Sequence, residues 1–569
     1  MRKLTIVLCA VALLVVIAIF VICFRLFSVI GKGTREVREY TPSVATQGEK
    51  INEKMNSILG YTAGDVISEL SVKRRVILSE LGVAADNFEA ADENSRIIRN
   101  AINSAFEGTE LVLPEGKVFI REGFELYGKK DLRIVGKDTV LVNTGYSPMK
   151  LGIIPGDASR IFNIAGCRNI HLEGFKIDYA KPATAEGIIT KISGGKVYFE
   201  LLGEYSEEYK TLVEGGEAVF SVLVANDGGF YNEIWPQEGT QLSKEEGELE
   251  FSVPASIGKV GDRICCRISC GNVASPAIFV ANTSGLELRD IGCFSCPSAF
   301  FYATVGNSNF VFSGLDIAVS DKGVSMLASN EDCIHIKQLS GKLLLEDCSF
   351  EGIGDDALNI HTKLCEVKAI EGNKVTIGAG GSTEPFPNGF FLKGETAEFF
   401  GASGKSLGIA TVKNTGSGFI VLDKLPEGVK AGTLIQNVST SPDVLVKNCT
   451  VRDGRARGVL LQAKNAVISG CTFENLRLSA ILASPDFTYW YEGGFADNLL
   501  VTGNRFVNCT NAASGNGFGV VSVITSHDEV RNNVYLKGHK NVTVTDNVFE
   551  SCRGKKVVVT STHNQTVEN

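Results

Sequence analysis

The chain has no excess of positive charge. Its 569 residues include 56 Lys and Arg against 65 Asp and Glu, a formal net charge of −9. Proteins that bind nucleic acid or another polyanion usually carry a positive surface. The balance therefore argues against a nucleic-acid partner and favours a neutral one. Charged residues make up 21% of the chain, an ordinary share for a folded protein, which excludes disorder over its whole length.

Two further absences narrow the class of fold. The 61 Gly show no three-residue period, which excludes a collagen-like chain and favours a turn-rich β protein. The 15 Cys lack the dense spacing of a small disulfide scaffold, and no Cys-x-x-Cys pair recurs at zinc-finger spacing. A local disulfide among Cys265, Cys266 and Cys270 is left open.

Long apolar runs are also scarce, and the one that could cross a membrane stands at the start. Residues 4–24 contain a single polar residue, Thr5, and basic residues flank the run on both sides. About 20 apolar residues cross the hydrocarbon of a bilayer, whereas a secretory signal has a shorter apolar core and a small-residue cleavage site. Residues 1–30 are therefore predicted to be a signal anchor rather than a cleaved signal peptide. In either case we expect the remainder outside the cytoplasm, at the cell surface or secreted.

A short pattern recurs along the chain: alternating apolar residues, a tight polar turn and a second apolar pair. Where nothing is inserted, neighbouring copies lie 22 to 33 residues apart, as from Cys449 to Cys471. Strands of about five residues, three to a turn, fit one coil of a parallel β-solenoid, which predicts an all-β fold. Equivalent side chains then stack inside the coil about 4.8 Å apart. The residues aligned in this way are Phe175, Ile291, Leu315, Cys348, Cys449, Cys471, Asn504 and Asn547. We expect the three Cys of this set to be packed thiols.

Two stretches keep strand-like alternation but lose the coil period, namely 187–271 and 362–440. Each is about 80 residues long, enough for a small β-barrel inserted at a loop. An amphipathic segment from Asp92 onward predicts a helix that covers the open end of the coil, where strand edges are unpaired. The expected order is a stem with a helix (31–84, helical near 62–82), then the coil (85–186, 272–361 and 441–569) interrupted by the two inserts.

Polar residues that a solenoid does not need are concentrated at 330–335 and 354–361. Asp332 and Asp355 are 23 residues apart, which is one coil, so we expect their side chains on one face together with Asp356. Crowded carboxylates repel one another and raise at least one pKa, which puts an acid beside a base. Glycosidic hydrolysis needs that pair: one carboxyl protonates the leaving oxygen and another activates water or attacks carbon. Two alternatives stay open, Asp side chains that only bind backbone amides and a Ca²⁺ site.

These two blocks resemble glycoside hydrolase family 110, the bacterial exo-acting α-1,3-galactosidases. The family signature has an Asp-x-x-His element and, one coil later, Asp-Asp-x-x-Asn-x-His. Further similar segments, in the family's order, occur at 177–179, 390–392, 399–400, 455–460 and 490–494. The resemblance implies a right-handed parallel β-helix with two inserted β-barrels. It also implies inverting hydrolysis, without a metal or another cofactor, of terminal α-linked galactose on blood-group B or linear α-1,3-galactosyl glycans.

The resemblance assigns roles to individual residues. Asp332, Asp355 and Asp356 match the catalytic carboxylates, with acid and base unassigned, and the acting pair of an inverting enzyme is expected about 6.5–9.5 Å apart. The residues assigned to the sugar are His335, Asn359, His361, Arg457, Trp490 and Glu492. Of these, Arg457 and Glu492 are expected to hold the terminal galactose, and Trp490 to offer an aromatic face to the ring.

Three other interpretations stay open. A polygalacturonase-like hydrolase shares the Asn-x-Asp and Gly-Asp-Asp elements at 330–332 and 354–356, but this chain lacks that family's later Gly-His-Gly and Arg-Ile-Lys. A polysaccharide lyase needs Ca²⁺ or a basic residue beside a uronate. A non-catalytic β-helix surface adhesin predicts no loss of function in Asp355→Asn. The one partner expected is a glycan with terminal α-galactose; membrane contact is limited to the N-terminal segment, and a homo-oligomer is left open.

Overall fold

The description of the fold rests on a computed structural model. The apolar run at 4–24 and residues 31–50 of the stem lie outside the described residues. None of the helices within the described part is long and apolar enough to cross a membrane. The described residues are 51–146, 159–181, 184–194, 196–202, 219–225, 231–234, 243–245, 248–252, 258–268, 276–319, 326–380, 389–401, 403–509, 518–525 and 537–569.

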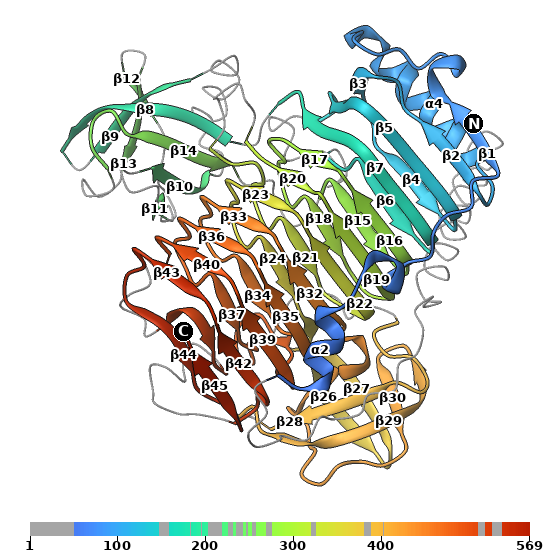
Figure 1. The fold of residues 1–569 in the computed structure, drawn as a ribbon, viewed down its shortest axis with the longest axis vertical. Helices are drawn as coiled ribbons and strands as arrows, with labels where there is room; N and C mark the ends of the chain where they lie inside the picture. Colours follow the sequence, from blue (N-terminus) through green and yellow to red (C-terminus); the bar gives the residue numbers. More distant parts are fainter. Residues whose placement is uncertain are drawn as a thin grey trace, which may run out of the picture.

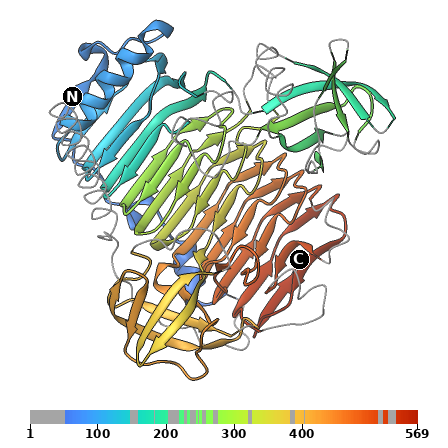
Figure 2. The ribbon, with the colours of Figure 1, turned by 180° about the vertical axis from the view of Figure 1, so that it is seen from behind.

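The body of the molecule is a coil of parallel strands, with the two inserts at opposite edges (Figure 1; Figure 2). The coil is built from a 20-stranded and a 10-stranded sheet, so the predicted all-β parallel solenoid is confirmed. The larger sheet contains β1 (Arg74–Ile77), β2 (Thr109–Val112), β3 (Gly116–Ile120), β5 (Lys130–Asn143), β7 (Arg168–Tyr179), β16 (Ser284–Arg289), β17 (Gly292–Cys293), β19 (Asn307–Ser313), β20 (Asp316–Ile317), β22 (Leu339–Glu346), β23 (Ser349–Glu351), β32 (Asp443–Lys447), β33 (Thr450–Arg452), β35 (Asn465–Ser469), β36 (Thr472–Glu474), β39 (Asn498–Thr502), β40 (Arg505–Val507), β42 (Val542–Thr545), β43 (Val548–Glu550) and β45 (Gln565–Glu568). The smaller sheet contains β4 (Phe124–Tyr127), β6 (Phe162–Ala165), β15 (Ile278–Ala281), β18 (Phe301–Ala303), β21 (Ile334–Ile336), β24 (Leu358–Ile360), β34 (Val459–Leu461), β37 (Ile481–Ala483), β41 (Gly519–Val523) and β44 (Lys555–Val559).

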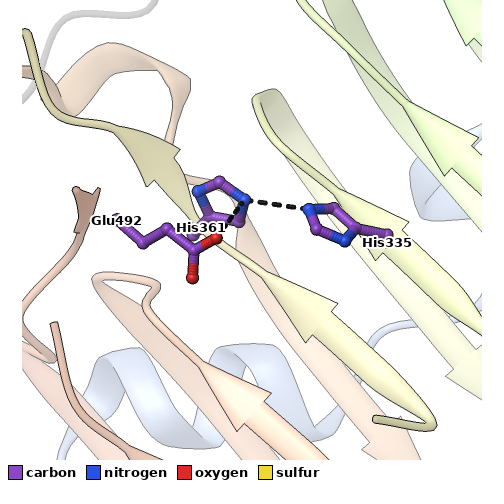
Figure 3. Close-up of side chains that lie close together, drawn as sticks. All are labelled: His335, His361 and Glu492. Carbon is purple, nitrogen blue, oxygen red and sulfur yellow. Dashed lines mark hydrogen bonds and ion pairs between the residues drawn. The ribbon is translucent and has the colours of Figure 1, made fainter. Parts of the chain in front are cut away.

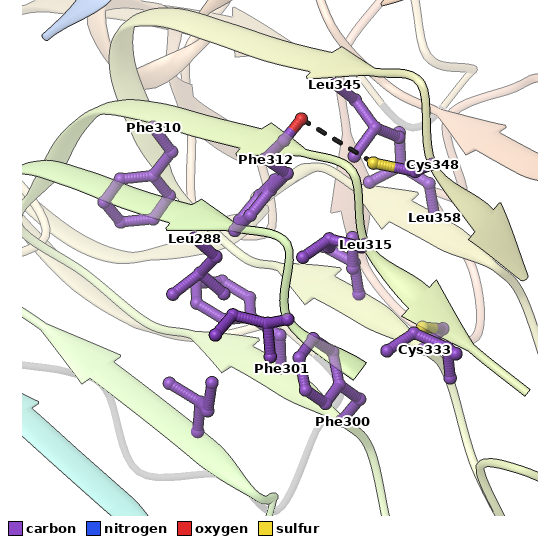
Figure 4. Packing of buried hydrophobic residues seen from close by; sticks show 14 of the residues in the cluster. Leu288, Phe300, Phe301, Phe310, Phe312, Leu315, Cys333, Leu345, Cys348 and Leu358 are labelled. Carbon is purple, nitrogen blue, oxygen red and sulfur yellow. Dashed lines mark hydrogen bonds between the residues drawn. The ribbon is translucent and has the colours of Figure 1, made fainter. Parts of the chain in front are cut away.

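The interior of the coil is filled by the stacked side chains that the repeat predicts, and all eight aligned residues are buried. Figure 4 shows part of this packing, where aromatic rings and Leu side chains surround Cys348. Toward the C-terminal end the stack becomes polar: the Cys471 amide donates to Asn504 Oδ1 over 2.9 Å, and the Asn504 amide donates to Asn547 Oδ1 over 3.0 Å. The aligned Cys are free, buried thiols, as predicted, and Cys265 and Cys266 are free as well, whereas Cys270 lies outside the described residues.

Replacing a single Asn of this stack is expected to lower the stability of the protein strongly. Asn504→Ala leaves the Cys471 amide and the Ile468 carbonyl without their partner inside the coil. Each buried unsatisfied group costs about 1–3 kcal/mol, so we expect the free energy of unfolding to fall by about 2–4 kcal/mol in urea titrations. Asn414→Ala, at an exposed residue, is the control. A loss for Asn504→Ala no larger than for Asn414→Ala would contradict the stack.

The open N-terminal end of the coil is covered by α4 (Ala91–Ser104), as the amphipathic pattern predicts (Figure 1). Its buried side chains, among them Ile98 and Ile102, belong to the same hydrophobic core as the coil. Short 3₁₀ turns at Leu78–Leu81 and Phe88–Ala90 precede it. The capping helix therefore continues the core instead of forming a separate unit.

The prediction of a helix near 62–82 was wrong over most of that segment. Only α3 (Ala63–Val66) is α-helical there, and β1 pairs in parallel with β2, because adding a strand to the sheet outweighs local helix propensity. The helix of the stem is α2 (Glu53–Leu59), whose Met55 and Ile58 are buried against outward-facing apolar side chains of the coil. This part of the stem is thus bound to the coil.

The two inserts differ in form. The first comprises a seven-stranded antiparallel sheet: β8 (Thr184–Ser193), β9 (Lys196–Leu201), β10 (Val219–Ala225), β11 (Tyr231–Ile234), β12 (Ser243–Glu245), β13 (Glu248–Ser252) and β14 (Arg263–Ile268). The second is a closed barrel of β26 (Cys365–Glu371), β27 (Lys374–Ala379), β28 (Thr396–Phe400), β29 (Ser406–Gly416), β30 (Phe419–Leu422) and β31 (Leu434–Asn437), followed by a 3₁₀ turn at Val438–Thr440. The barrel begins two residues after β25 (Thr362–Lys363), directly beside the candidate site.

Candidate active site

The candidate residues lie on the outer face of the ten-stranded sheet and at the bends that lead into its strands. In β21 and β24 the outer residues of each three-residue strand are buried in the core, and the central residue faces outward because strand side chains alternate. The central residues, His335 and Asn359, are partners in register. The bends before β21, β24 and β34 carry Asp332, the Asp355–Asp356 pair and Arg457. One short repeat therefore brings acids and sugar-binding candidates to one surface.

The three Asp carboxylates converge, as their one-coil spacing predicts. Each offers an oxygen that lies within 4.8 Å of those of the other two. The backbone amide of Asp356 donates to Asp332 Oδ1 over 2.9 Å, which fixes one acid against the next coil. All three line a cavity of about 650 Å³. The cluster is tighter than the 6.5–9.5 Å expected of an inverting pair, because neighbouring coils are spaced by strand pairing at only about 4.8 Å.

The three acids differ in their surroundings. Arg457 Nη1 lies 3.1 and 3.2 Å from the two carboxylate oxygens of Asp356, whereas Arg455 Nη1 contacts Oδ1 of Asp355 at 3.0 Å. The exposed fraction of the side chain is 3% for Asp356, 13% for Asp332 and 46% for Asp355. Arg457, which the resemblance assigns to galactose, thus binds a catalytic candidate. Arg455 was missed, although its place two residues earlier on the same bend could have indicated it.

Burial sets the protonation of the cluster. It raises the pKa of Asp332 well above the ordinary value, and the negative charge of Asp355 adds to that effect. Burial also raises the pKa of Asp356, to about 7, although Arg457 opposes the rise. The pKa of Glu331 is raised too, mainly by burial. Near neutral pH Asp332 therefore retains a proton while Asp356 is partly ionised, so the cluster holds both forms that an acid–base pair requires.

A chain of hydrogen-bonding groups runs from Asp332 to Glu492, and Figure 3 shows the part from His335 to Glu492. His335 Nδ1 lies 2.6 Å from Asp332 Oδ2, and His335 Nε2 lies 3.0 Å from His361 Nε2, which is 3.4 Å from Glu492 Oε1. Burial lowers the pKa of His335 to about 4 and that of His361 well below the ordinary value, so both rings are neutral at neutral pH. One Nε2 then donates to the other, and Asp332 is linked to the far wall of the cavity.

Glu492 reaches the site from a distant part of the chain. It begins β38 (Glu492–Gly493), which pairs antiparallel with β25, and its backbone is bonded to Asp486 in both directions at 2.7 and 2.9 Å. The loop 486–492 carries Trp490 at the rim of the cavity with 60% of its surface exposed. Cavity-lining residues that the sequence did not indicate include Gln462, Leu478, Leu482 and Tyr489. Asn359 Oδ1 is buried without a partner among the described residues, so it can accept a hydrogen bond from a sugar hydroxyl.

Two clusters of side chains carry the kinds of atoms that bind a cation. The ligand atoms of His335, His361 and Glu492 lie within 4.8 Å of one another, as do those of the three Asp. Imidazole with carboxylate suits Zn²⁺, and carboxylates alone suit Ca²⁺ or Mg²⁺. The expectation that neither group needs a metal stays a prediction, and a chelator tests it.

Glu492 makes stability depend on pH. Burial raises its pKa from 4.5 to about 7, so the folded protein holds a proton that the unfolded chain has released. The contribution is full below about pH 4.5 and is lost as the pH rises through about 7, a change of about 3 kcal/mol. We expect Glu492→Gln to flatten the fall in the free energy of unfolding between about pH 5 and about pH 8, measured by urea titration. An unchanged slope in the variant would show that Glu492 is ionised in the folded protein.

Comparison with known proteins finds relatives over about two thirds of the chain. Residues 431–569 match the family model described as "Right handed beta helix region". The chain is 24% identical over 428 residues to alpha-1,3-galactosidase B of Bacteroides thetaiotaomicron, covering 68% of this chain and 66% of that protein. It is 26% identical to alpha-1,3-galactosidase A of Akkermansia muciniphila, covering 69% and 67%.

The matches thus span about two thirds of the length of these relatives. Among solved structures, an exopolygalacturonase from Thermotoga maritima aligns with 90% of this chain and 93% of its own, at 12% identity and a TM-score of 0.44. The sequence relatives share one name, and their similarity extends well beyond the motifs. The chain is therefore similar to α-1,3-galactosidases over about two thirds of its length, in agreement with its resemblance to glycoside hydrolase family 110.

Proposed function

We propose that the chain releases terminal α-1,3-linked galactose from glycans outside the cytoplasm, with inversion at the anomeric carbon. The observation that carries the proposal is the convergence of three carboxylates in one cavity, in a chain related to α-1,3-galactosidases. An exo-acting enzyme needs a cavity that encloses one terminal sugar and opens toward the rest of the glycan. A cavity of about 650 Å³ has the size of small-molecule sites.

Exposure supports Asp355 as the general acid. In such a cavity the leaving oxygen points toward the opening, and the attacking water approaches from the enclosed side. Asp355 is the most exposed of the three acids, with 46% of its side chain in contact with solvent. Arg455 Nη1 contacts Oδ1 of Asp355 at 3.0 Å, which holds the side chain at this place.

The two buried acids then hold the water. Arg457 favours the ionised form of Asp356, which makes Asp356 the base. Asp332 accepts the Asp356 amide with Oδ1 and is joined to His335 through Oδ2, so its carboxyl plane is fixed beside that water. The carboxylate spacing alone favours neither stereochemical outcome, and inversion rests on the family resemblance.

The purified full chain tests the proposal with p-nitrophenyl α-galactoside, linear Galα1,3Gal and the blood-group B trisaccharide. We expect galactose from at least one of the two oligosaccharides, with equal rates before and after EDTA treatment. Loss of activity in EDTA would contradict the proposal that hydrolysis needs no metal. Release of galacturonate from polygalacturonan instead would favour the polygalacturonase-like alternative, and an unsaturated uronate product would favour a lyase. Activity on none of the substrates would favour the adhesin.

A further inference from the structure

Two large aromatic side chains are exposed in the loop 486–492. Tyr489 has 72% of its surface exposed and Trp490 has 60%, and their rings meet edge to face at 4.8 Å. The other aromatic residues of the loop, Phe487 and Tyr491, pack on a buried cluster that includes Phe400. The loop thus has an apolar cluster to pack on but leaves two rings in water. Exposed aromatic pairs of this kind mark contact with a ligand.

The loop holds these rings on a fixed frame. Its ends are joined by the backbone bonds between Asp486 and Glu492. Asp486 Oδ1 accepts the amides of Thr488 and Tyr489 at 2.8 and 2.9 Å. Lys363 Nζ donates to the carbonyl oxygen of Trp490 at 2.7 Å. Because the frame is formed before binding, little conformational entropy is lost when a ligand contacts the rings.

The rings line the same cavity as the carboxylates but are far more exposed. The cavity is lined by Asp332, Asn359 and Glu492, and also by Tyr489, Trp490 and the apolar side chain of Leu478. The first group is buried, with relative exposures of 6% for Asn359 and 8% for Glu492, whereas the aromatic tip is open to solvent. Buried polar groups suit the hydroxyls of an enclosed sugar. Aromatic and aliphatic surfaces suit the C–H face of a pyranose.

We infer that Tyr489 and Trp490, with Leu478, form a second subsite that binds the sugar remaining on the glycan after cleavage. The inference rests on the proposed function, because the buried polar residues then take the terminal galactose. The chain of the glycan must leave the cavity at its open side, where the two rings are. The occupant is therefore a neutral pyranose whose C–H face lies on the aromatic pair. The subsite determines which glycans are cleaved, while the chemistry takes place at the Asp cluster.

Kinetics on two substrates separate the subsite from the chemistry. Galα1,3Gal has a retained sugar, whereas α-galactosyl fluoride has none and reacts at the same Asp cluster. We expect Trp490→Ala to lower kcat/KM for Galα1,3Gal about 30-fold, mainly through KM, and to change that for the fluoride less than about 3-fold. Trp490→Phe is expected to recover most of the loss, and Phe106→Ala, at an exposed aromatic residue far along the chain, is the control. Equal losses on both substrates would overturn the subsite.

Binding of a retained sugar gives a readout that needs no activity. Trp235 is the second of the two Trp in the chain, so Trp235→Phe makes Trp490 the only tryptophan fluorophore. We expect methyl β-galactoside to shift the emission of Trp490 to shorter wavelength, and Tyr489→Ala to weaken that binding about 10-fold. A shift in a protein that hydrolyses nothing would preserve the subsite and refute the proposed function. No shift at saturating methyl β-galactoside would refute the subsite in an active enzyme.

Discussion

Asp355→Asn is expected to lower kcat/KM for Galα1,3Gal about 1,000-fold and to leave hydrolysis of α-galactosyl fluoride within about 10-fold of wild type. Fluoride leaves without a proton, so a substrate that carries it does not need the general acid. The amide keeps the shape of the side chain but cannot transfer a proton to the leaving oxygen. Initial rates on the two substrates, measured with the same enzyme preparation, are sufficient.

The companion variants make the assignment of Asp355 falsifiable. Asp356→Asn removes the proposed base, so both substrates are expected to lose activity together. The raised pKa of Asp332 makes Asp332 the rival acid. If Asp332→Asn keeps activity on the fluoride and Asp355→Asn does not, the two roles are reversed. If all three variants keep full activity on Galα1,3Gal, the cluster is not the catalytic site.

Removal of Arg457 is expected to be costly to both stability and activity. Its guanidinium contacts both carboxylate oxygens of Asp356, and the two side chains are 18% and 3% exposed. Breaking a buried pair from one side typically costs about 3–5 kcal/mol, because it leaves a buried charge without its partner. Arg457→Ala further raises the pKa of Asp356, so less of the base is ionised at neutral pH. We expect kcat/KM to fall about 100-fold near pH 7 on both substrates, with part of the loss recovered at higher pH.

Two controls isolate that effect. Arg452→Ala breaks an ion pair with Glu351 in which Arg452 is 47% exposed, and is expected to cost less than about 1 kcal/mol. In a double-mutant cycle, adding Asp356→Asn to Arg457→Ala should destabilise the protein less than the sum of the single changes. Additive losses would show that Arg457 acts on stability through other contacts. A pH profile unchanged by Arg457→Ala would show that Arg457 does not control the ionisation of Asp356.

The features predicted well are those that repeat along the chain. The stack from Phe175 to Asn547 and the meeting of Asp332 with Asp355 follow from one number, the length of a coil, because parallel strands in register turn sequence spacing into position. A closed barrel replaces the coil period where that period is lost, between β26 and β31. The helix near 62–82 failed because β1 forms its hydrogen bonds with β2, a distant partner that local propensity does not describe.

Sequence spacing does not predict the parts of the site that depend on contacts across the cavity. Arg457 was expected to bind sugar, and its bond to Asp356 depends on two bends whose side-chain directions have no period. The loop at 486–492 places Trp490 at the rim and Glu492 inside, and that division results from the pairing of β38 with β25. The hydrogen-bonded chain from Asp332 through His335 and His361 to Glu492 joins segments up to 160 residues apart. A sequence motif shows which of these residues are present but not which of them are bonded to each other.

The most direct test of the account is the anomer that is released first. Proton NMR on the wild-type chain with Galα1,3Gal, recorded within the first minutes and before mutarotation, distinguishes the two forms of free galactose. We expect β-galactose first, with the α-anomer growing in only as mutarotation proceeds, and no galactose from Asp355→Asn on the same time scale. Initial release of α-galactose would contradict inversion by the Asp cluster, and release of no galactose at all would contradict the proposed function.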